Sequence, residues 1–495
     1  MSTRTVLRHA RFARDAPPRD MLIVDGHVAA IGELREIPDG DEVSAGGRFV
    51  LPGLWDHHVH FDQWAQVSAR LDLSGAESAA GAAQLAADQL ARRPRDAGAP
   101  LVGYGFRDAL WNDLPHRELL DHATGDVPVV LIGADLHCAW LNTAALRRFG
   151  EGDHESGVLR EDVAMRVIGD VAVVGQDAGD ALAGDAARAA AARGVVGIVD
   201  MEQPWSLPAW RRRIGAGQRS LRVVSSVWTE CLPAVIEQGL RTGDVIAGTS
   251  GLLTVGPFKV ITDGSLNTRT AYCHAAYEGL TGEGDGFGMS LVSAPDLERL
   301  MRQATDAGID CAIHAIGDRA NALVLQAFAA TGARGSVEHA QLLDDADIAR
   351  FAELGVVASV QPEHAMDDRD VADRYWAGRT RRAFVLRSLL DAAAVLALGS
   401  DAPVAPLDPW VAIAAAVHRT RDERERWHPE QEITLDEALL ASMPSPRRSL
   451  TLRVGDPADL VVLDADPFAA TPAELRAMPV AATMVAGHWS HRTSF

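Results

Sequence analysis

The sequence has 495 residues, of which 47% are hydrophobic, 23% charged and 5% aromatic, as is ordinary for a globular enzyme with a large core. Its formal net charge of -21 argues against nucleic acid or an anionic membrane as a partner, because both bind basic surfaces. The four cysteines form no CxxC pair, and neither a signal-peptide core nor a run of roughly 18 apolar residues occurs, so we expect a cytoplasmic protein without a cysteine-based zinc site.

The two ends of the chain carry the same short, alternating pattern. Residues 20–33 alternate in polarity and turn on a glycine, as in a β-meander, and similar segments return at 458–468 and 481–491. We therefore expect residues 1–50 and 451–495 to pair into one small β-sandwich domain.

Between these ends, eight short apolar runs alternate with helical segments rich in Ala and Arg. Continuous Val, Ile and Leu runs are typical of parallel strands that are buried on both faces. Eight of them alternating with helices predict an α/β fold, a (β/α)₈ TIM barrel over residues 51–450. Residues 61–190 are too long for one connection and predict a helical, lid-like insertion over the barrel mouth. The eight runs are 49–60, 194–201, 221–228, 252–264, 310–318, 335–342, 356–365 and 394–404.

Polar side chains of metal-ligand type follow five of these runs, where the strands of a barrel converge on one mouth. His58 and His60 are two residues apart on one strand, so both can face inward while His57 points away. A lone histidine is more often a hydrogen-bonded core or surface residue. Six residues of metal-ligand type at the ends of five strands instead predict a divalent metal site. These residues are His58, His60, Lys259, His314, His339 and Asp401.

Several long motifs resemble one known family. They include VLPGLWDHHVH (50–60), FKVITDGSLNTRTA, IHAIGDRAN, VEHAQL and LGSDAPVAPLDP. The chain is similar to the amidohydrolase superfamily, and within it to the family 3 branch that contains N-substituted formamide deformylase. The resemblance implies an amidohydrolase-type barrel with a sandwich from both termini, hydrolysis of a C–N bond and a homodimer. It also implies one or two divalent ions, zinc first among them, bound by His58, His60, His314, His339 and Asp401.

Lys259 occupies the position where many superfamily members carry a carboxylated lysine that bridges two metals. Burial and a nearby cation lower the pKa of an amine, and the neutral amine can react with CO₂ to give a carbamate anion. Two alternatives stay open. Lys259 can pack its stem and pair with Asp263 instead, and Glu161 in GVLRE can supply the bridging carboxylate.

Asp401 is also the expected catalytic base. A divalent ion lowers the pKa of a water molecule that it binds, and a carboxylate can then take the proton and return it to the leaving nitrogen. Aromatic or polar residues in the insertion, and Gln361 with His364 after the seventh run, are candidates for substrate binding. For Trp111, packing in the core of the insertion is an equal alternative to substrate binding. The substrate-binding candidates are His137, Asp135, Trp111, Glu161 and Gln361.

Three classes of function remain on these grounds. The first is hydrolysis of a small amide, formamide or cyclic amide. The second uses the same site for deamination, decarboxylation or isomerisation of a small molecule. The third is a non-catalytic descendant of the fold, since a fold does not fix a function. Because none of the expected ligands is missing, the sequence favours an enzyme.

Overall fold

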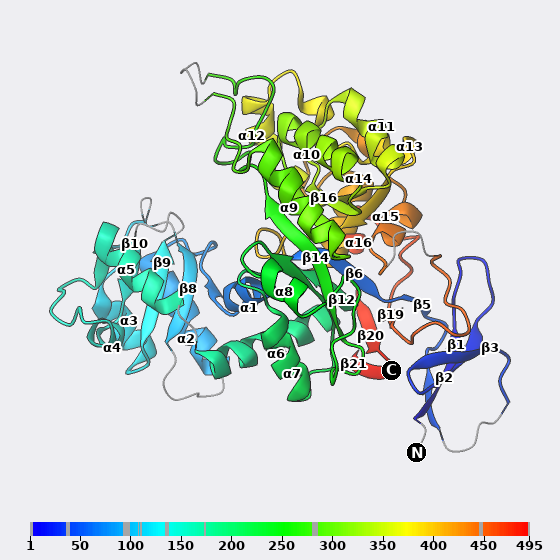
Figure 1. Ribbon diagram of the computed structural model, residues 1–495. Helices are drawn as coiled ribbons and strands as arrows, with labels where there is room; N and C mark the ends of the chain where they lie inside the picture. Colours follow the sequence, from blue (N-terminus) through cyan, green and yellow to red (C-terminus); the bar gives the residue numbers. More distant parts are fainter. Residues whose placement is uncertain are drawn as a thin grey trace. The chain divides into compact units, whose positions relative to one another are not determined.

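A computed structural model describes residues 3–35, 40–92, 100–106, 108, 111–133, 138–172, 175–279, 286–444 and 449–493, without the side chains of residues 161, 162 and 172. The chain divides into two compact units. The larger one combines Met1–Trp64 with Gly184–Phe495, and the smaller one is Ala65–Ala183. Figure 1 shows the strands and helices of both units, coloured from the N-terminus to the C-terminus.

The larger unit contains a parallel sheet of eight strands whose order follows the chain. The sheet closes because Val59, at the end of the first strand, pairs with Ala402, which follows the last one. This is a (β/α)₈ TIM barrel, as the sequence predicted. Its strands are β6 (Leu54–Val59), β12 (Val195–Asp200), β13 (Arg222–Trp228), β14 (Leu253–Ile261), β15 (Cys311–Ala315), β16 (Gly335–His339), β17 (Val357–Val360) and β18 (Val395–Leu398).

Each of the eight predicted apolar runs holds one barrel strand. In β14, for example, Val255, Phe258 and Val260 are all at most 4% exposed, because inner and outer faces of the strand are both covered. The first run holds two strands, with β5 (Phe49–Pro52) in another sheet and β6 in the barrel. Gly53 lies between them, where a Cβ atom would approach the Val196 side chain to within 2.1 Å.

Helices follow the barrel strands and have ordinary start and stop signals. Helix α10 ends at Gly332 in the left-handed conformation, and Thr434 and Glu437 form a capping box at the start of α15. Among the described residues, no helix combines the length and hydropathy needed to span a bilayer. The helices are α1 (Phe61–Ser68), α6 (Gln176–Ala191), α7 (Leu207–Gly215), α8 (Leu232–Glu237), α9 (Ala294–Asp306), α10 (Asp318–Thr331), α11 (Asp345–Leu354), α12 (Pro362–Tyr375), α13 (Leu386–Asp391), α14 (Pro409–His418), α15 (Leu435–Ala441) and α16 (Pro472–Arg476), with 3₁₀ turns at Thr380–Arg382 and Pro429–Gln431.

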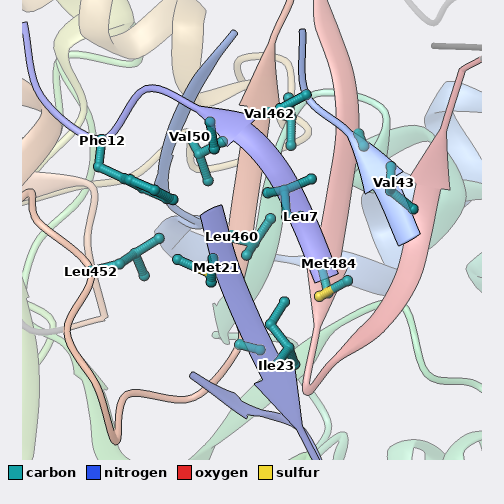
Figure 2. Close-up of a cluster of buried hydrophobic side chains, with 14 of the residues drawn as sticks. Leu7, Phe12, Met21, Ile23, Val43, Val50, Leu452, Leu460, Val462 and Met484 are labelled. Carbon is teal, nitrogen blue, oxygen red and sulfur yellow. The ribbon is translucent and has the colours of Figure 1, made fainter. Parts of the chain in front are cut away.

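Strands from both ends of the chain form two four-stranded sheets beside the barrel (Figure 1). Figure 2 shows side chains of the two sheets pointing toward one another, among them Leu7, Met21, Leu460 and Met484, all buried. This is the predicted β-sandwich. One sheet has the order β3 (His27–Gly32), β2 (Arg19–Val24), β1 (Arg4–Ala10) and β4 (Asp41–Ser44), and the other β21 (His488–Arg492), β20 (Val480–Val485), β19 (Leu460–Leu463) and β5.

The smaller unit corrects the expectation of a helical insertion, because it contains a five-stranded mixed sheet. Alternate residues of its strands enter two separate hydrophobic clusters, with Leu131 in one and Ile132 in the other. Helices therefore cover a sheet with two apolar faces. The strands, in sheet order, are β11 (Val158–Arg160), β10 (Cys138–Leu141), β9 (Val129–Gly133), β8 (Leu101–Phe106) and β7 (Leu71–Asp72), and the helices are α2 (Ala79–Arg92), α3 (Arg117–Thr124), α4 (Thr143–Arg148) and α5 (Glu161–Ala172).

Candidate metal centre

The first barrel strand, β6, places His58 inside the barrel. The ring Nδ1 of His58 donates a hydrogen bond of 2.6 Å to Oε2 of Glu338, and both side chains are 1% exposed. Glu338 lies on β16 and also accepts a hydrogen bond from Ser336. Because Nδ1 of His58 is taken up by this hydrogen bond, its other ring nitrogen, Nε2, is available to bind a metal ion. Metal-binding histidines commonly have a carboxylate that orients the ring in this way.

Asp401 meets the first strand where the barrel closes. Its backbone N–H donates to the carbonyl of His58 at 2.7 Å, and the N–H of His60 donates to the carbonyl of Ala402 at 2.8 Å. The strands approach closely because residue 399 is Gly, where a Cβ atom would lie 2.7 Å from the His58 nitrogen. Asp401 itself has φ +56°, a conformation that non-glycine residues adopt rarely and often at functional sites.

One carboxylate oxygen of Asp401 faces two imidazoles. Oδ1 lies 3.6 Å from Nε2 of His58 and 3.4 Å from Nε2 of His60. Neighbouring ligand atoms in a tetrahedral zinc site are roughly 3.4 Å apart, because Zn–N and Zn–O distances are about 2.0–2.2 Å. These three residues form one of the groups that could hold a metal ion.

A second group shares Asp401 and adds His339 and His364. Nε2 of His364 lies 3.9 Å from Oδ2 of Asp401, and its ring stacks on that of His339 with centroids 6.0 Å apart. His339 ends β16 with φ +72°, so it too is held in the left-handed region. His364 thus faces a different oxygen of the Asp401 carboxylate from the one that His58 and His60 face.

Lys259 and His314 lie against these groups. Nζ of Lys259 is 3.4 Å from Nε2 of His58, and the rings of His314 and His339 have centroids 4.4 Å apart. Asp263, the alternative partner of Lys259, instead accepts hydrogen bonds of 2.9–3.0 Å from three backbone N–H groups, those of residues 272, 316 and 317. All six residues predicted from the strand ends are therefore brought together, and their role as ligands stays a prediction.

His57 points away from this centre. Its Nε2 hydrogen-bonds the carbonyl oxygen of Met443 at 2.8 Å, and its ring stacks on Trp55. The alternation along β6 therefore directs His57 outward and His58 inward, as the spacing predicted.

Electrostatics favour the neutral, metal-binding form of two of these histidines, His58 and His339. Burial and the charge of Lys259 lower the pKa of His58 to about 4. Burial and the neighbouring His314 hold the pKa of His339 well below its usual value. Burial also lowers the pKa of Lys259. For Glu338, burial raises the pKa, but the hydrogen bond from His58 and its charge outweigh this effect and bring the pKa to about 2.

The donor set fits a divalent metal ion. Each group offers two imidazoles and a carboxylate, the donors that zinc and similar ions take. Buried polar atoms are normally paired, yet four buried ring nitrogens have no hydrogen-bond partner in the described part of the chain. They are His60 Nδ1, His314 Nε2, His339 Nδ1 and His364 Nε2.

Comparison with known proteins identifies the family. The sequence model of the amidohydrolase family matches residues 41–491. The chain belongs to the amidohydrolase family. It is 26% identical to N-substituted formamide deformylase of Arthrobacter pascens over 96% of this chain and 95% of that protein. It is also 28% identical to the protein LONG AFTER FAR-RED 3 of Arabidopsis thaliana, over 90% of this chain and 83% of that protein.

A solved structure agrees with this assignment. An uncharacterized metal-dependent hydrolase from Pyrococcus horikoshii is similar to this amidohydrolase with a TM-score of 0.75 and 26% identity, over 95% of this chain and 99% of that one. Family membership, this likeness and the two ligand groups together support a hydrolase with a divalent metal.

The substrate-binding candidates fall into three situations. In the smaller unit of this amidohydrolase, Nε1 of Trp111 donates to the carbonyl of Ala76 at 3.1 Å, and its ring packs on that unit's own core. Gln361 is 2% exposed at the start of α12, and its Nε2 lacks a partner among the described residues. Asp135, His137 and the side chain of Glu161 lie outside the described residues. The roles proposed for all five stay predictions.

Glu338 is the functional residue that sequence reasoning missed in this amidohydrolase. It stands inside the VEHAQL motif next to His339, but its partner His58 comes from the far end of the barrel sequence. Only the closure of the barrel, which brings β16 and β6 to one interior, relates the two residues.

We predict that Glu338→Gln lowers metal affinity by about 10- to 100-fold, because the amide accepts from His58 Nδ1 without the negative charge. Competition with a coloured chelator measures this affinity. The matched control is Glu430→Gln, which alters an exposed histidine–glutamate pair with a 2.9 Å contact to His428. Unchanged affinity in Glu338→Gln would show that the pair has only a packing role.

Proposed function

We propose that this amidohydrolase is a zinc-dependent enzyme that cleaves a non-peptide C–N bond of a small amide, with an N-substituted formamide as the first candidate substrate. The observation that carries the proposal is the carboxylate of Asp401, which faces two ligand groups with its two oxygens. The deformylase from Arthrobacter pascens, similar over 96% of this chain, supports the choice of formamides.

His58, His60 and Asp401 would hold one ion, and His314, His339 and Lys259 are proposed for a second. When bound, a divalent ion in such a site lowers the pKa of water toward about 7 and polarises a carbonyl oxygen. Asp401 accepts the proton of the attacking water on a carboxylate oxygen. It then returns this proton to the nitrogen of the leaving amine.

Lys259 is proposed to carry a carbamate formed with CO₂. It is 1% exposed, and it is the only lysine among the 47 Lys and Arg residues of the chain. An arginine cannot replace it in this reaction, because the guanidinium is not deprotonated in proteins and offers no neutral amine. Glu161 stays the alternative source of a bridging carboxylate.

A substrate panel tests the proposed reaction. Purified enzyme would be incubated with N-formyl, N-acyl and cyclic amides, with release of carboxylate and amine followed for each. We expect formate from at least one N-substituted formamide. Release of ammonia or CO₂ without carboxylate would instead assign the site to deamination or decarboxylation, the alternative chemistries of the same centre.

We predict that Lys259→Ala lowers the metal content toward half and that short carboxylic acids partly restore it. The reason is that a small carboxylate can occupy the space of the lost carbamate, whereas in Lys259→Arg, the matched control, the side chain fills it. Because the chain has one lysine, ¹³C-bicarbonate should give one side-chain carbamate signal by NMR in the wild type and none in Lys259→Ala. Absence of that signal in fully metallated wild type would move the bridge to Glu161.

A further inference from the structure

His364 is a buried histidine that the proposed ligand set leaves unused. It follows β17 on the first turn of α12 and is 6% exposed. Its Nε2 has no hydrogen-bond partner among the described residues. A buried imidazole nitrogen of this kind needs an acceptor, a donor or an ion, since buried polar atoms are rarely left unpaired.

The position of His364 matches that of a metal ligand. Its ligand atom lies within 4.8 Å of those of both His339 and Asp401. The 3.9 Å from His364 Nε2 to Asp401 Oδ2 exceeds the 3.4 Å and 3.6 Å contacts of Oδ1 by only a few tenths of an ångström. A small rotation of either side chain therefore brings it to the roughly 3.4 Å spacing of a tetrahedral zinc site.

His314 is less favourably placed for this second group. Its Nε2 lies 3.4 Å from Oδ1 of Asp263, a carboxylate already held by backbone N–H groups. The group of His339 and Asp401 includes His364 but not His314. Within the described residues, His364 thus faces the free oxygen of Asp401 more directly than His314 does.

A buried carboxylate also lies near His364 on the same helix. Asp368 lies one turn further along α12, is buried and interacts electrostatically with His364. Asn267 donates to its Oδ1 at 2.6 Å and Gln341 to its Oδ2 at 3.3 Å, which fixes the carboxylate in place. This fixed carboxylate places an acidic group one helical turn from His364, and acidic groups near the imidazole are usual for metal-binding histidines.

We infer that His364 is a ligand of the second metal ion, together with His339. This assignment adds a residue to the predicted ligands and leaves Oδ2 of Asp401, 3.9 Å from His364 Nε2, beside the second ion as the proton acceptor. It rests on the proposed function, because it requires a metal-loaded site with two ions.

The test is metal stoichiometry of the full chain. Wild type, His364→Gln, His364→Asp and the control His488→Ala, which removes an exposed histidine of β21, would be loaded with zinc, desalted and measured by elemental analysis. We expect two ions per chain in the wild type and in the control. His364→Gln should fall toward one ion, because an amide replaces the imidazole at similar size, and His364→Asp should retain more because it still offers a ligand atom. Circular dichroism checks that each variant is folded.

Different results separate this inference from the proposed function. If His364→Gln keeps both ions and only its KM rises, His364 contacts substrate and the inference is wrong. A wild type that is active with one ion also overturns the inference and leaves the proposed hydrolysis intact. A wild type that hydrolyses amides fully without stoichiometric metal contradicts the proposed function itself.

Discussion

Substitution of Asp401 by Asn is expected to lower kcat by roughly 10²–10⁴ while most of the metal stays bound. Asparagine keeps the shape of the side chain and an amide oxygen that can still approach His58 and His60. It lacks the second carboxylate oxygen and cannot accept a proton, so the transfer from water to the leaving nitrogen is lost. The effect should therefore appear in kcat, with a smaller change in KM.

Steady-state kinetics and elemental analysis of the same Asp401→Asn preparation measure these two effects together. Asp177→Asn, which changes an exposed aspartate in the first turn of α6, is the matched control and should behave as wild type. Loss of both metal and turnover in proportion would mean that Asp401 acts only as a ligand. Retention of full kcat would remove it from the mechanism.

Replacement of His58 or His60 by Ala should remove metal and turnover together. Each side chain is one of three in the first ligand group, and two remaining ligands do not hold an ion in an open catalytic geometry. Chelation of the wild type should have the same effect and should be reversed by added zinc. Full activity in either variant, or in metal-free wild type, would refute the assignment.

The two histidine variants should differ in stability. His58→Ala leaves Glu338 buried without its 2.6 Å partner, and hydrogen bonds to charged groups contribute about 1.5–3 kcal/mol. His60 is more exposed, at 21%, and its contact with Asp401 is longer, at 3.4 Å. Urea unfolding of the metal-free proteins should therefore show a larger loss of unfolding free energy for His58→Ala than for His60→Ala.

The barrel and its strand-end residues could be predicted because both depend on local sequence. A strand buried on both faces is a continuous apolar run, and each barrel strand lies within such a run. In a TIM barrel the C-terminal ends of all strands lie at one mouth. His58, Lys259 and Asp401, each at such an end, could therefore be predicted to lie close together.

Features that depend on contacts between distant parts of the chain could not be predicted. The pairing of Glu338 with His58 joins two residues that are far apart in the chain, and neither the VEHAQL nor the VLPGLWDHHVH motif indicates this contact. His364 was predicted only as a substrate-binding candidate after the seventh run, and its position beside His339 and Asp401 appears only in the structure. The sheet of the smaller unit was missed because β8 and β9 are short apolar runs within a long Ala-rich region.

The closure of the barrel between β6 and the residues after β18 has a consequence for biosynthesis. During translation, His58 and His60 are made early, whereas Asp401 follows only after every other barrel strand. A growing chain therefore offers an ion only part of the first ligand group, and tight binding awaits the docking of the last strand on the first. Tight binding of the ion would then occur only after the barrel has closed. It would add about 2.7 kcal/mol to the free energy of unfolding at a free ion concentration of 100 times Kd. The supply of metal would in this way affect both the loading of the site and the stability of the folded barrel.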